Sequence, residues 1–413
     1  MAGRGVDRGA YPQHMSIASF FGGSAPARLA RDTLFIPSFA NAAALLTSDG
    51  VVLVDCGHEL SGPAIHAAVR AFTDAPLHTV VYTHGHVDHV GGWGPWEAEG
   101  ADPRVVAHEA VHSRFDRYLR TPGLNEHINR VQFGVEGVRW PRAFRRPDIT
   151  YRTSLDLEVG GETLHLHHAR GETDDATWLW APDRGVLCTG DLWISSVPNC
   201  GNPQKVQRYP DGWADALEVM AGLRAEVLLP GHGPAIEGAD TVRSALLEVC
   251  GFLRSIVEQT LDLLNAGVVA DEIPHRVRIP DVADSPYLAP IYDRPEFIIR
   301  NVIRLYGGWW NGRPADLLPA PASSRAREIA RLAGGVGPLV ARARELAATD
   351  LPLACHLAEW ALLADPGSAE AQSAVRDLFA RRAEEETSLM GQGIYRHAVR
   401  EAEAALGSAQ DVD

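Results

Sequence analysis

The stretch Thr83–His89, which reads T-H-G-H-V-D-H, constrains this chain more than any other. It follows the run Leu77–Tyr82, whose β-branched and aromatic residues predict a buried strand. The motif should therefore lie in the loop at the carboxyl end of that strand. Its three imidazoles and one carboxylate are the ligands that Zn²⁺ and similar cations prefer. In a loop, the first two histidines can point one way and the last two ligands another. That arrangement suits two metal ions that hold a hydroxide between them.

Three later segments carry further candidate ligands at strand ends or turns. Val186–Asp191 reads as a short strand ending in T-G-D, and Val227–Gly233 reads as a strand ending in P-G-H-G. Gly171–Asp175 lies in a turn after the strand-like run Thr163–His168. A chance cluster of surface histidines does not predict matching ligands downstream.

This order of motifs resembles the metallo-β-lactamase superfamily over about residues 30 to 240. The resemblance implies a four-layered αββα sandwich with two metal ions at one edge of the sheets. It implies that Asp191 bridges both ions. The remaining ligands carried over from the superfamily motif are His84, His86 and Glu172 for the first metal, and Asp88, His89 and His232 for the second.

The assignment of Glu172 needs a separate argument. Most superfamily members have a histidine in a G-H-T turn here, whereas this chain has Gly171-Glu172-Thr173. Alkylsulfatases resemble this chain in using a glutamate, so we assign Glu172 to the first metal. Alternatively, His167 or His168 reaches the metal, although strand alternation points these two histidines to opposite faces. We expect two Zn²⁺ ions, with Mn²⁺ or Fe²⁺ as alternatives because a carboxylate is a harder ligand than imidazole.

The second half of the chain sharpens the resemblance. Asn301–Ala315, which contains Y-G-G-W-W-N-G-R-P-A, looks like the signature of the alkylsulfatase dimerisation domain. Ala333-Gly334-Gly335 and Ala364-Asp365-Pro366 also match its pattern. The whole chain is thus similar to the zinc-dependent alkylsulfatases, which implies sulfate ester hydrolysis and a homodimer formed through the C-terminal helical domain.

Candidate groups for substrate binding follow the T-G-D strand. Alkylsulfatases similarly place an asparagine and an arginine after the bridging acid, and Asn199 and Arg208 are the counterparts here. The planar fork of arginine suits oxyanions, although a loop cap and a solvated surface arginine explain these two residues equally well. Asp88 would also orient the nucleophilic hydroxide. Trp193, Trp309 and Trp310 line either an alkyl pocket or a core or interface.

We expect a fold of the α+β class in three segments. Residues 1–30 form a flexible N-terminal arm, residues 31–240 a catalytic domain, and residues 241–413 an all-helical dimerisation domain. Helices are predicted over Thr241–Leu264 and Glu296–Tyr306, and Thr121–Asp148 is predicted as a long connection. Asp174 and Asp175 are expected to orient histidine ligands, and Asp175 could contact His84 or His86 directly.

Charge and cysteine usage exclude several partners. The formal net charge of −15 argues against nucleic acid and anionic membranes. Five scattered cysteines without a C-x-x-C pair suit a reducing compartment. The sequence shows no secretory signal and no membrane span, so we expect a cytoplasmic protein.

Other functions remain open on these residues. The P-G-H-G motif looks like that of hydrolases acting on a lactone, thioester or lactam. Some superfamily members bind iron and use oxygen, which leaves an iron-dependent oxidoreductase as an alternative. A non-catalytic dimeric binding protein is disfavoured because the ligand set is intact.

Overall fold

The computed structural model describes residues 24–410, which fall into two compact units. The sheet unit comprises the described residues up to Pro122 together with Trp140–Gly308. The helical unit comprises Gly123–Arg139 and the chain from Trp309 onward.

Two β-sheets form the centre of the sheet unit. In the described residues, the first sheet has seven strands in sequence order, and β4 to β7 run parallel. Its strands are β1 Ala27–Ala30, β2 Thr33–Ile36, β3 Ala42–Thr47, β4 Gly50–Val54, β5 Leu77–Val81, β6 Arg104–His108 and β7 Ile149–Tyr151. The second sheet has six strands in reverse order and is antiparallel except between β11 and β12. Its strands are β8 Ser154–Val159, β9 Glu162–Ala169, β10 Ala176–Ala181, β11 Val186–Ile194, β12 Val227–His232 and β13 Ile236–Glu237.

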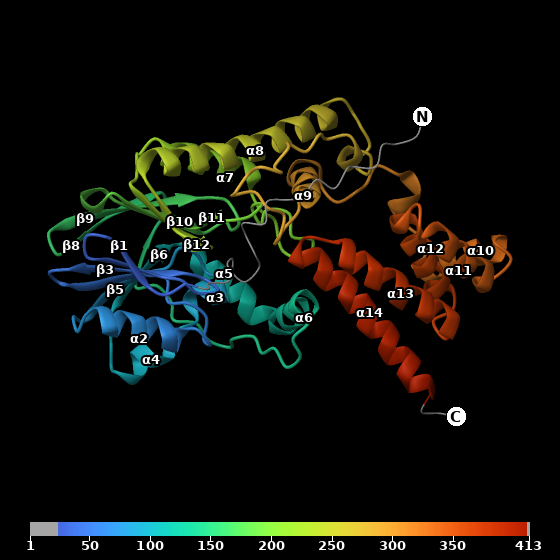
Figure 1. Ribbon diagram of the computed structural model, residues 1–413, viewed down its shortest axis with the longest axis horizontal. Coiled ribbons are helices and arrows are strands. Elements are labelled where there is room, and N and C mark those ends of the chain that lie inside the picture. Colours follow the sequence, from blue (N-terminus) through green and yellow to red (C-terminus); the bar gives the residue numbers. More distant parts are fainter. Residues whose placement is uncertain (1–23, 411–413) are drawn as a thin grey trace. The chain divides into compact units, whose positions relative to one another are not determined.

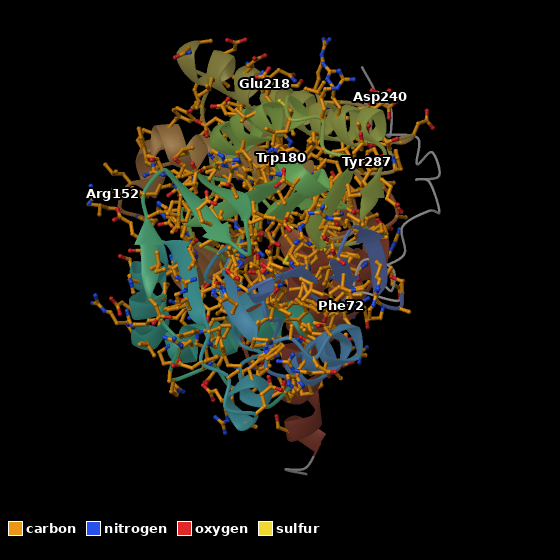
Figure 2. All side chains as sticks on the ribbon, turned by 90° about the vertical axis from the view of Figure 1, so that its left-hand side faces the viewer. Phe72, Arg152, Trp180, Glu218, Asp240 and Tyr287 are labelled. Atoms are coloured by element: carbon orange, nitrogen blue, oxygen red, sulfur yellow. The ribbon has the colours of Figure 1, made fainter. Side chains whose placement is uncertain are left out.

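The two sheets pack face to face through alternating apolar side chains, with Leu45 and Val52 of the first sheet and Leu166 and Leu179 of the second fully buried between them. Side chains fill the space between the two sheets (Figure 2). The apolar packing between the sheets is continuous, so the polar ligands collect at the sheet edge.

Helices cover the outer face of each sheet (Figure 1). The first sheet is covered by α2 Gly62–Phe72, α4 Gly94–Ala98 and α5 Ala110–Arg120, and the one-turn helix α3 Val87–Val90 lies in the metal-motif loop. The second sheet is covered by α7 Pro210–Ala221, α8 Ala239–Asn265 and α9 Pro295–Gly307. This order of layers confirms the predicted αββα sandwich.

The helical unit confirms the predicted all-helical C-terminal region. Its helices are α6 Pro122–Phe133 (all but its first residue), α10 Ala322–Leu332, α11 Val336–Leu346, α12 Leu351–Ala364, α13 Ala369–Glu385 and α14 Leu389–Gln410. Small side chains let the helices approach closely, as at Ala354, Ala358 and Ala371, which are fully buried. The chain breaks between helices at Gly334-Gly335 and Asp365–Gly367, as the sequence predicts.

Two sequence expectations need correction. The connection Thr121–Asp148 is not irregular throughout, because α6 occupies its first half. The expected arm, residues 1–30, lies outside the described residues up to residue 23, and its end is β1, which pairs with β2. The expected division near residue 240 stays a prediction; by its contacts, α8 belongs to the sheet unit.

The cysteines and helices of the described region agree with the sequence expectations. All five cysteines are buried and form no disulfide. Within residues 24–410, no helix is long and apolar enough to cross a membrane.

Candidate metal centre

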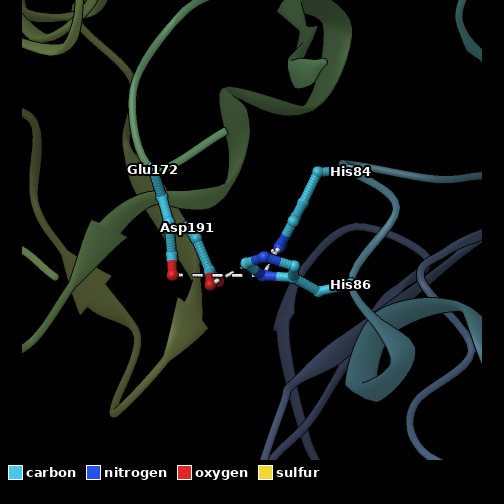
Figure 3. Close-up of side chains that lie close together, drawn as sticks. All are labelled: His84, His86, Glu172 and Asp191. Atoms are coloured by element: carbon cyan, nitrogen blue, oxygen red, sulfur yellow. Dashed lines mark hydrogen bonds and ion pairs between the residues drawn. The ribbon is translucent and has the colours of Figure 1, made fainter. Parts of the chain in front are cut away.

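Seven side chains from four segments form two groups of potential metal ligands. The first group contains His84, His86, Glu172 and Asp191, and the second contains Asp88, His89 and His232. In each group one ligand atom per residue lies within 4.8 Å of all the others. Figure 3 shows the first group, in which the two histidines of the β5 loop face the two carboxylates of the opposite sheet. All seven predicted ligands are thus brought together.

Asp191, near the middle of β11, lies between the two groups. Its Oδ2 is 3.6 Å from His84 Nε2 and 3.3 Å from His232 Nε2, and its Oδ1 is 3.3 Å from His89 Nε2. One carboxylate therefore reaches histidines of both groups, as a residue that bridges two cations must.

The donor atoms fit bound cations. Several buried side-chain atoms within residues 24–410 have no hydrogen-bond partner, and three of them belong to the two groups: His89 Nε2, Glu172 Oε2 and Asp191 Oδ1. Buried polar atoms are rarely left unpaired, because desolvation without a partner costs about 1–3 kcal/mol each. The three unpaired atoms of the two groups are therefore available to ligate a metal ion.

The electrostatics of the first group keep its histidines neutral. Burial and the neighbouring His89 lower the pKa of His84 to about 4. Burial and His84 likewise hold the pKa of His86 well below its usual range. Neutral imidazole is the form that binds a metal, so these two side chains are ready to do so at neutral pH.

In the second group, neighbouring carboxylates raise the pKa values of both histidines. Burial lowers the pKa of His89, but the carboxylates of Asp191 and Asp55 outweigh it and raise that pKa above its usual value. His232 behaves in the same way beside Asp191. Without cations, these histidines neutralise part of the buried negative charge; with cations bound, their protons must leave.

Asp55, which directly follows β4, supports the site although no sequence motif marks it. Its carboxylate accepts hydrogen bonds from the backbone N–H of Thr83 at 2.7 Å, the Thr83 hydroxyl at 2.7 Å and His89 Nδ1 at 2.6 Å. Asp55 adopts a left-handed φ of 58° that turns the chain toward the site. The usable signal was an aspartate at the end of an apolar strand adjacent to β5.

A second support holds the loop between His84 and His86. Gly85 N–H donates to Asp175 Oδ2 at 3.0 Å, and the buried Arg114 of α5 donates to Asp175 Oδ1 at 2.9 Å and also pairs with Asp174. A Cβ at Gly85 would lie 2.8 Å from Arg114 Cδ, so the position needs glycine. Asp175 therefore does not contact a histidine directly; it holds the backbone between them.

A third support holds the P-G-H-G segment. Asn41 Nδ2 donates to the carbonyls of Pro230 at 3.0 Å and Gly233 at 2.8 Å, on either side of His232. The His232 ring contacts the Phe39 carbonyl through Nδ1, which leaves Nε2 facing the second group. The turn from β2 to β3 thereby orients His232.

Asn199 and Arg208 lie against Glu172. Asn199 Nδ2 donates to Glu172 Oε1 at 2.7 Å, and Arg208 pairs with the same oxygen and with the Asn199 carbonyl. All three side chains are buried. Neither residue is a surface group, and both contact Glu172 Oε1, which leaves Oε2 as the carboxylate oxygen without a hydrogen-bond partner.

The alternative ligands lie elsewhere. His168 Nδ1 donates to the Ala176 carbonyl at 3.0 Å and its ring stacks on His108, and His167 stacks on Trp178. Neither joins either group. Trp193 is a core residue against Tyr287, whereas Trp309 is 77% exposed.

Comparison with known families agrees with this architecture. Residues 36–232 match the metallo-β-lactamase superfamily. Residues 269–405 match the alkyl sulfatase dimerisation family. The protein therefore belongs to the metallo-β-lactamase superfamily. Within that superfamily it falls in the alkylsulfatase branch, because its C-terminal region matches the alkyl sulfatase dimerisation family and its curated relatives include alkylsulfatases.

Individual relatives show how far the similarity extends. The chain is 28% identical over 316 residues to a linear primary-alkylsulfatase of Pseudomonas sp., covering 70% of this chain and 59% of that protein. It is 23% identical over 371 residues to an (R)-specific secondary-alkylsulfatase of Pseudomonas sp., covering 82% and 56%. The chain thus spans little more than half the length of these curated relatives.

A solved structure shows the same fold. The stereoselective inverting sec-alkylsulfatase Pisa1 from Pseudomonas sp. superposes with a TM-score of 0.80 at 19% identity, covering 93% of this chain and 65% of that one. At this identity the likeness establishes the fold, and function has to be argued from the site.

Proposed function

We propose that this protein is a dinuclear metal-dependent hydrolase of sulfate esters. The observation that carries the proposal is the pair of ligand groups joined by Asp191, with buried donor atoms that lack protein partners. The alkylsulfatase relatives and the dimerisation match support the choice of substrate class.

Each ligand receives a role in this proposal. His84, His86 and Glu172 would hold the first cation, and Asp88, His89 and His232 the second, with Asp191 shared. The histidine-rich set favours Zn²⁺, and the carboxylate of Glu172 also suits Mn²⁺ or Fe²⁺. Such a pair of cations supplies a hydroxide nucleophile near neutral pH and stabilises developing negative charge.

The protein's own side chains orient the reactants. Asp88 Oδ2 lies 3.7 Å from His232 Nε2, and its side chain is more exposed than that of Asp191, so it can accept a proton from an incoming water. Arg208 and Asn199 occupy one oxygen of Glu172 and leave the other for the cation. We assign Asn199 and Arg208 to this orienting role.

An anionic ester needs a cation that is not already paired. Arg208 is taken up by Glu172, but Lys205 lies half-buried on the same loop. Burial and Arg208 lower the pKa of Lys205 to about 8, and Asp88 and Glu172 lie within electrostatic reach. Lys205 is therefore our candidate for contacting the sulfate group.

The test is release of inorganic sulfate by the purified, zinc-loaded chain from primary and secondary alkyl sulfates of graded chain length. We expect turnover that Asp191→Asn abolishes and Lys205→Met weakens mainly through KM. Absence of sulfate release at every chain length, with two metal ions per chain verified by mass spectrometry, would remove the sulfatase assignment.

A second candidate is hydrolysis of a neutral ester, lactone, thioester or lactam. The pairing of Arg208 with Glu172 favours it, because the most buried cation of the site is then unavailable to an anionic substrate. A panel of chromogenic esters and lactams separates the two candidates. An iron-dependent oxidoreductase would instead show bound iron and oxygen uptake.

We also propose that the protein forms a homodimer through the region that matches the alkyl sulfatase dimerisation family, residues 269–405. Analytical ultracentrifugation of the full chain tests this. A single species with the mass of one chain across the micromolar range would contradict it.

A further inference from the structure

A large groove lies within the helical unit, among α12, α13 and α14. It has a volume of about 740 Å³, within the range of about 300–1,000 Å³ that is typical of small-molecule sites. Its walls are mainly apolar and include Leu362, Val375, Phe379, Ile394 and Ala398. None of the seven candidate metal ligands lines it.

One arginine, Arg382, lines this groove. Arg382 is half-buried, and its guanidinium lies 5.4 Å from the ring centroid of Tyr395, which also lines the groove. Within residues 24–410, no carboxylate pairs with Arg382. Its neighbours on α13 differ, because Arg376 pairs with Asp377 and Arg381 with Glu385.

The walls of the groove suit an alkyl chain better than an extended peptide. They are formed by helices, whose backbone N–H and C=O groups are already bonded within each helix. An extended peptide would bury its own backbone groups there without partners, which is costly. An alkyl chain has no such groups and gains from contact with Phe379 and Ile394.

We propose that this groove binds an anionic amphiphile, with its head group on Arg382 and its alkyl chain along Phe379, Ile394 and Ala398. Charge complementarity selects the head group, since a planar guanidinium that has no carboxylate partner can bind a carboxylate or sulfate through two hydrogen bonds. The exposed Glu359 and Glu401 also line the groove, and their negative charges repel an anionic head group, which leaves Arg382 as its binding position. The inference does not depend on the metal centre or on the proposed reaction.

The experiment is isothermal titration of the full chain with decanoate and, separately, with decan-1-ol. We expect Arg382→Gln to weaken decanoate binding about tenfold, the worth of one charge-assisted contact, and to leave decan-1-ol binding unchanged. Ala398→Phe, which fills the groove, should abolish binding of both probes. Arg381→Gln is the matched control, because Arg381 is exposed and pairs on the helix surface.

Several outcomes would overturn the proposal. Equal decanoate affinity in the unaltered chain and in Arg382→Gln would exclude Arg382 as the anion site. Decanoate binding that survives Ala398→Phe would place the ligand elsewhere, for example at the metal centre. If Ala398→Phe instead halves the sedimenting mass while decanoate never binds, the groove seats a second copy of this chain. Circular dichroism confirms that each variant is folded before titration.

Discussion

At the residue scale, three buried contacts hold the candidate ligands: Asp55 on His89, Asp175 on Gly85 and Asn41 around His232. Each comes from a segment distant in sequence from the ligand that it orients. Contacts of this kind fix the ring orientation and basicity of ligating histidines, and their loss weakens metal affinity about 10–100-fold. The two ligand groups should therefore respond separately to substitutions.

The Asp55→Asn variant tests the second group. The asparagine amide has only one oxygen and no negative charge, so it cannot accept all the hydrogen bonds that Thr83 and His89 donate to Asp55. We therefore expect the second metal to bind about 10–100-fold more weakly, while binding of the first metal is retained. Competition with a chromophoric chelator measures both affinities. Asp49→Asn, in an exposed turn, is the control; equal weakening of both sites would contradict the argument.

The Arg114→Met variant tests the support of the first group. It leaves the Asp175 carboxylate buried without its ion pair, which costs about 3–5 kcal/mol of unfolding free energy. Urea denaturation measures that loss, and Arg120→Met on the exposed face of α5 is the control. Adding Asp175→Asn to Arg114→Met removes the unpaired charge and should restore part of the stability; an unchanged double variant would argue against the ion pair.

The buried Asp293 gives a pH prediction. Burial raises its pKa to about 7, although the N–H groups of Gly201 and Arg294 oppose the shift. The folded protein then holds a proton that the unfolded chain has lost, so the contribution of Asp293 to stability is greatest below about pH 4 and is lost as pH rises to about 7. Compared with the Asp293→Asn variant, the metal-free chain should lose about 4 kcal/mol of unfolding free energy between about pH 4 and about pH 7. Denaturation at graded pH measures it, and parallel curves would refute it.

The residues of the site could be predicted unevenly. The ligands could be found because they follow strand ends in short motifs, and parallel strands bring such ends to one edge. Asp55 obeys the same logic, since β4 pairs with β5, but an isolated D-C-G carries no motif. The pairing of Arg114 with Asp175 depends on how α5 packs, which no local pattern specifies.

At the element scale, strands were predictable and connections were not. β5 begins at Leu77 and β12 begins at Val227, as their apolar runs predict. α6 was missed because its sequence, P-G-L-N-E-H-I-N-R-V-Q-F, begins with turn-forming residues and has few apolar side chains. Packing of Ile128 and Val131, both buried, supplies what helix propensity lacks.

Side-chain caps at the N-termini of α12 and α13 stabilise the helical unit. Asp350 accepts from the N–H of Leu353 at 3.0 Å, and Ser368 accepts from the N–H of Ala371 at 3.2 Å. Replacing either with alanine should lower the unfolding free energy of the helical unit by about 1 kcal/mol. Denaturation followed by circular dichroism measures it. Ser373→Ala, inside α13, is the control and should change it less.

At the scale of the whole molecule, the candidate ligands all lie in the sheet unit. Metal binding stabilises only the unit that holds the site, by about 4 kcal/mol at a free concentration of about 1,000 Kd. Chelation should therefore lower the unfolding temperature of the sheet unit and leave the helical unit unchanged. Calorimetry with hydrogen exchange separates the two units. Uniform loss of protection across both would show that they unfold together.

The position of α6 in the sequence affects how the helical unit folds during synthesis. It packs on α14, where Gly393 lies against the Gln132 backbone and His127 meets His397 edge to face. During synthesis α6 therefore emerges from the ribosome long before α14, and it cannot complete its packing in the helical unit until α14 has emerged. For the same reason, cleavage after Gly308 would not separate the two units. The N-terminal fragment would keep α6 without its packing partner, and the C-terminal fragment would lack α6.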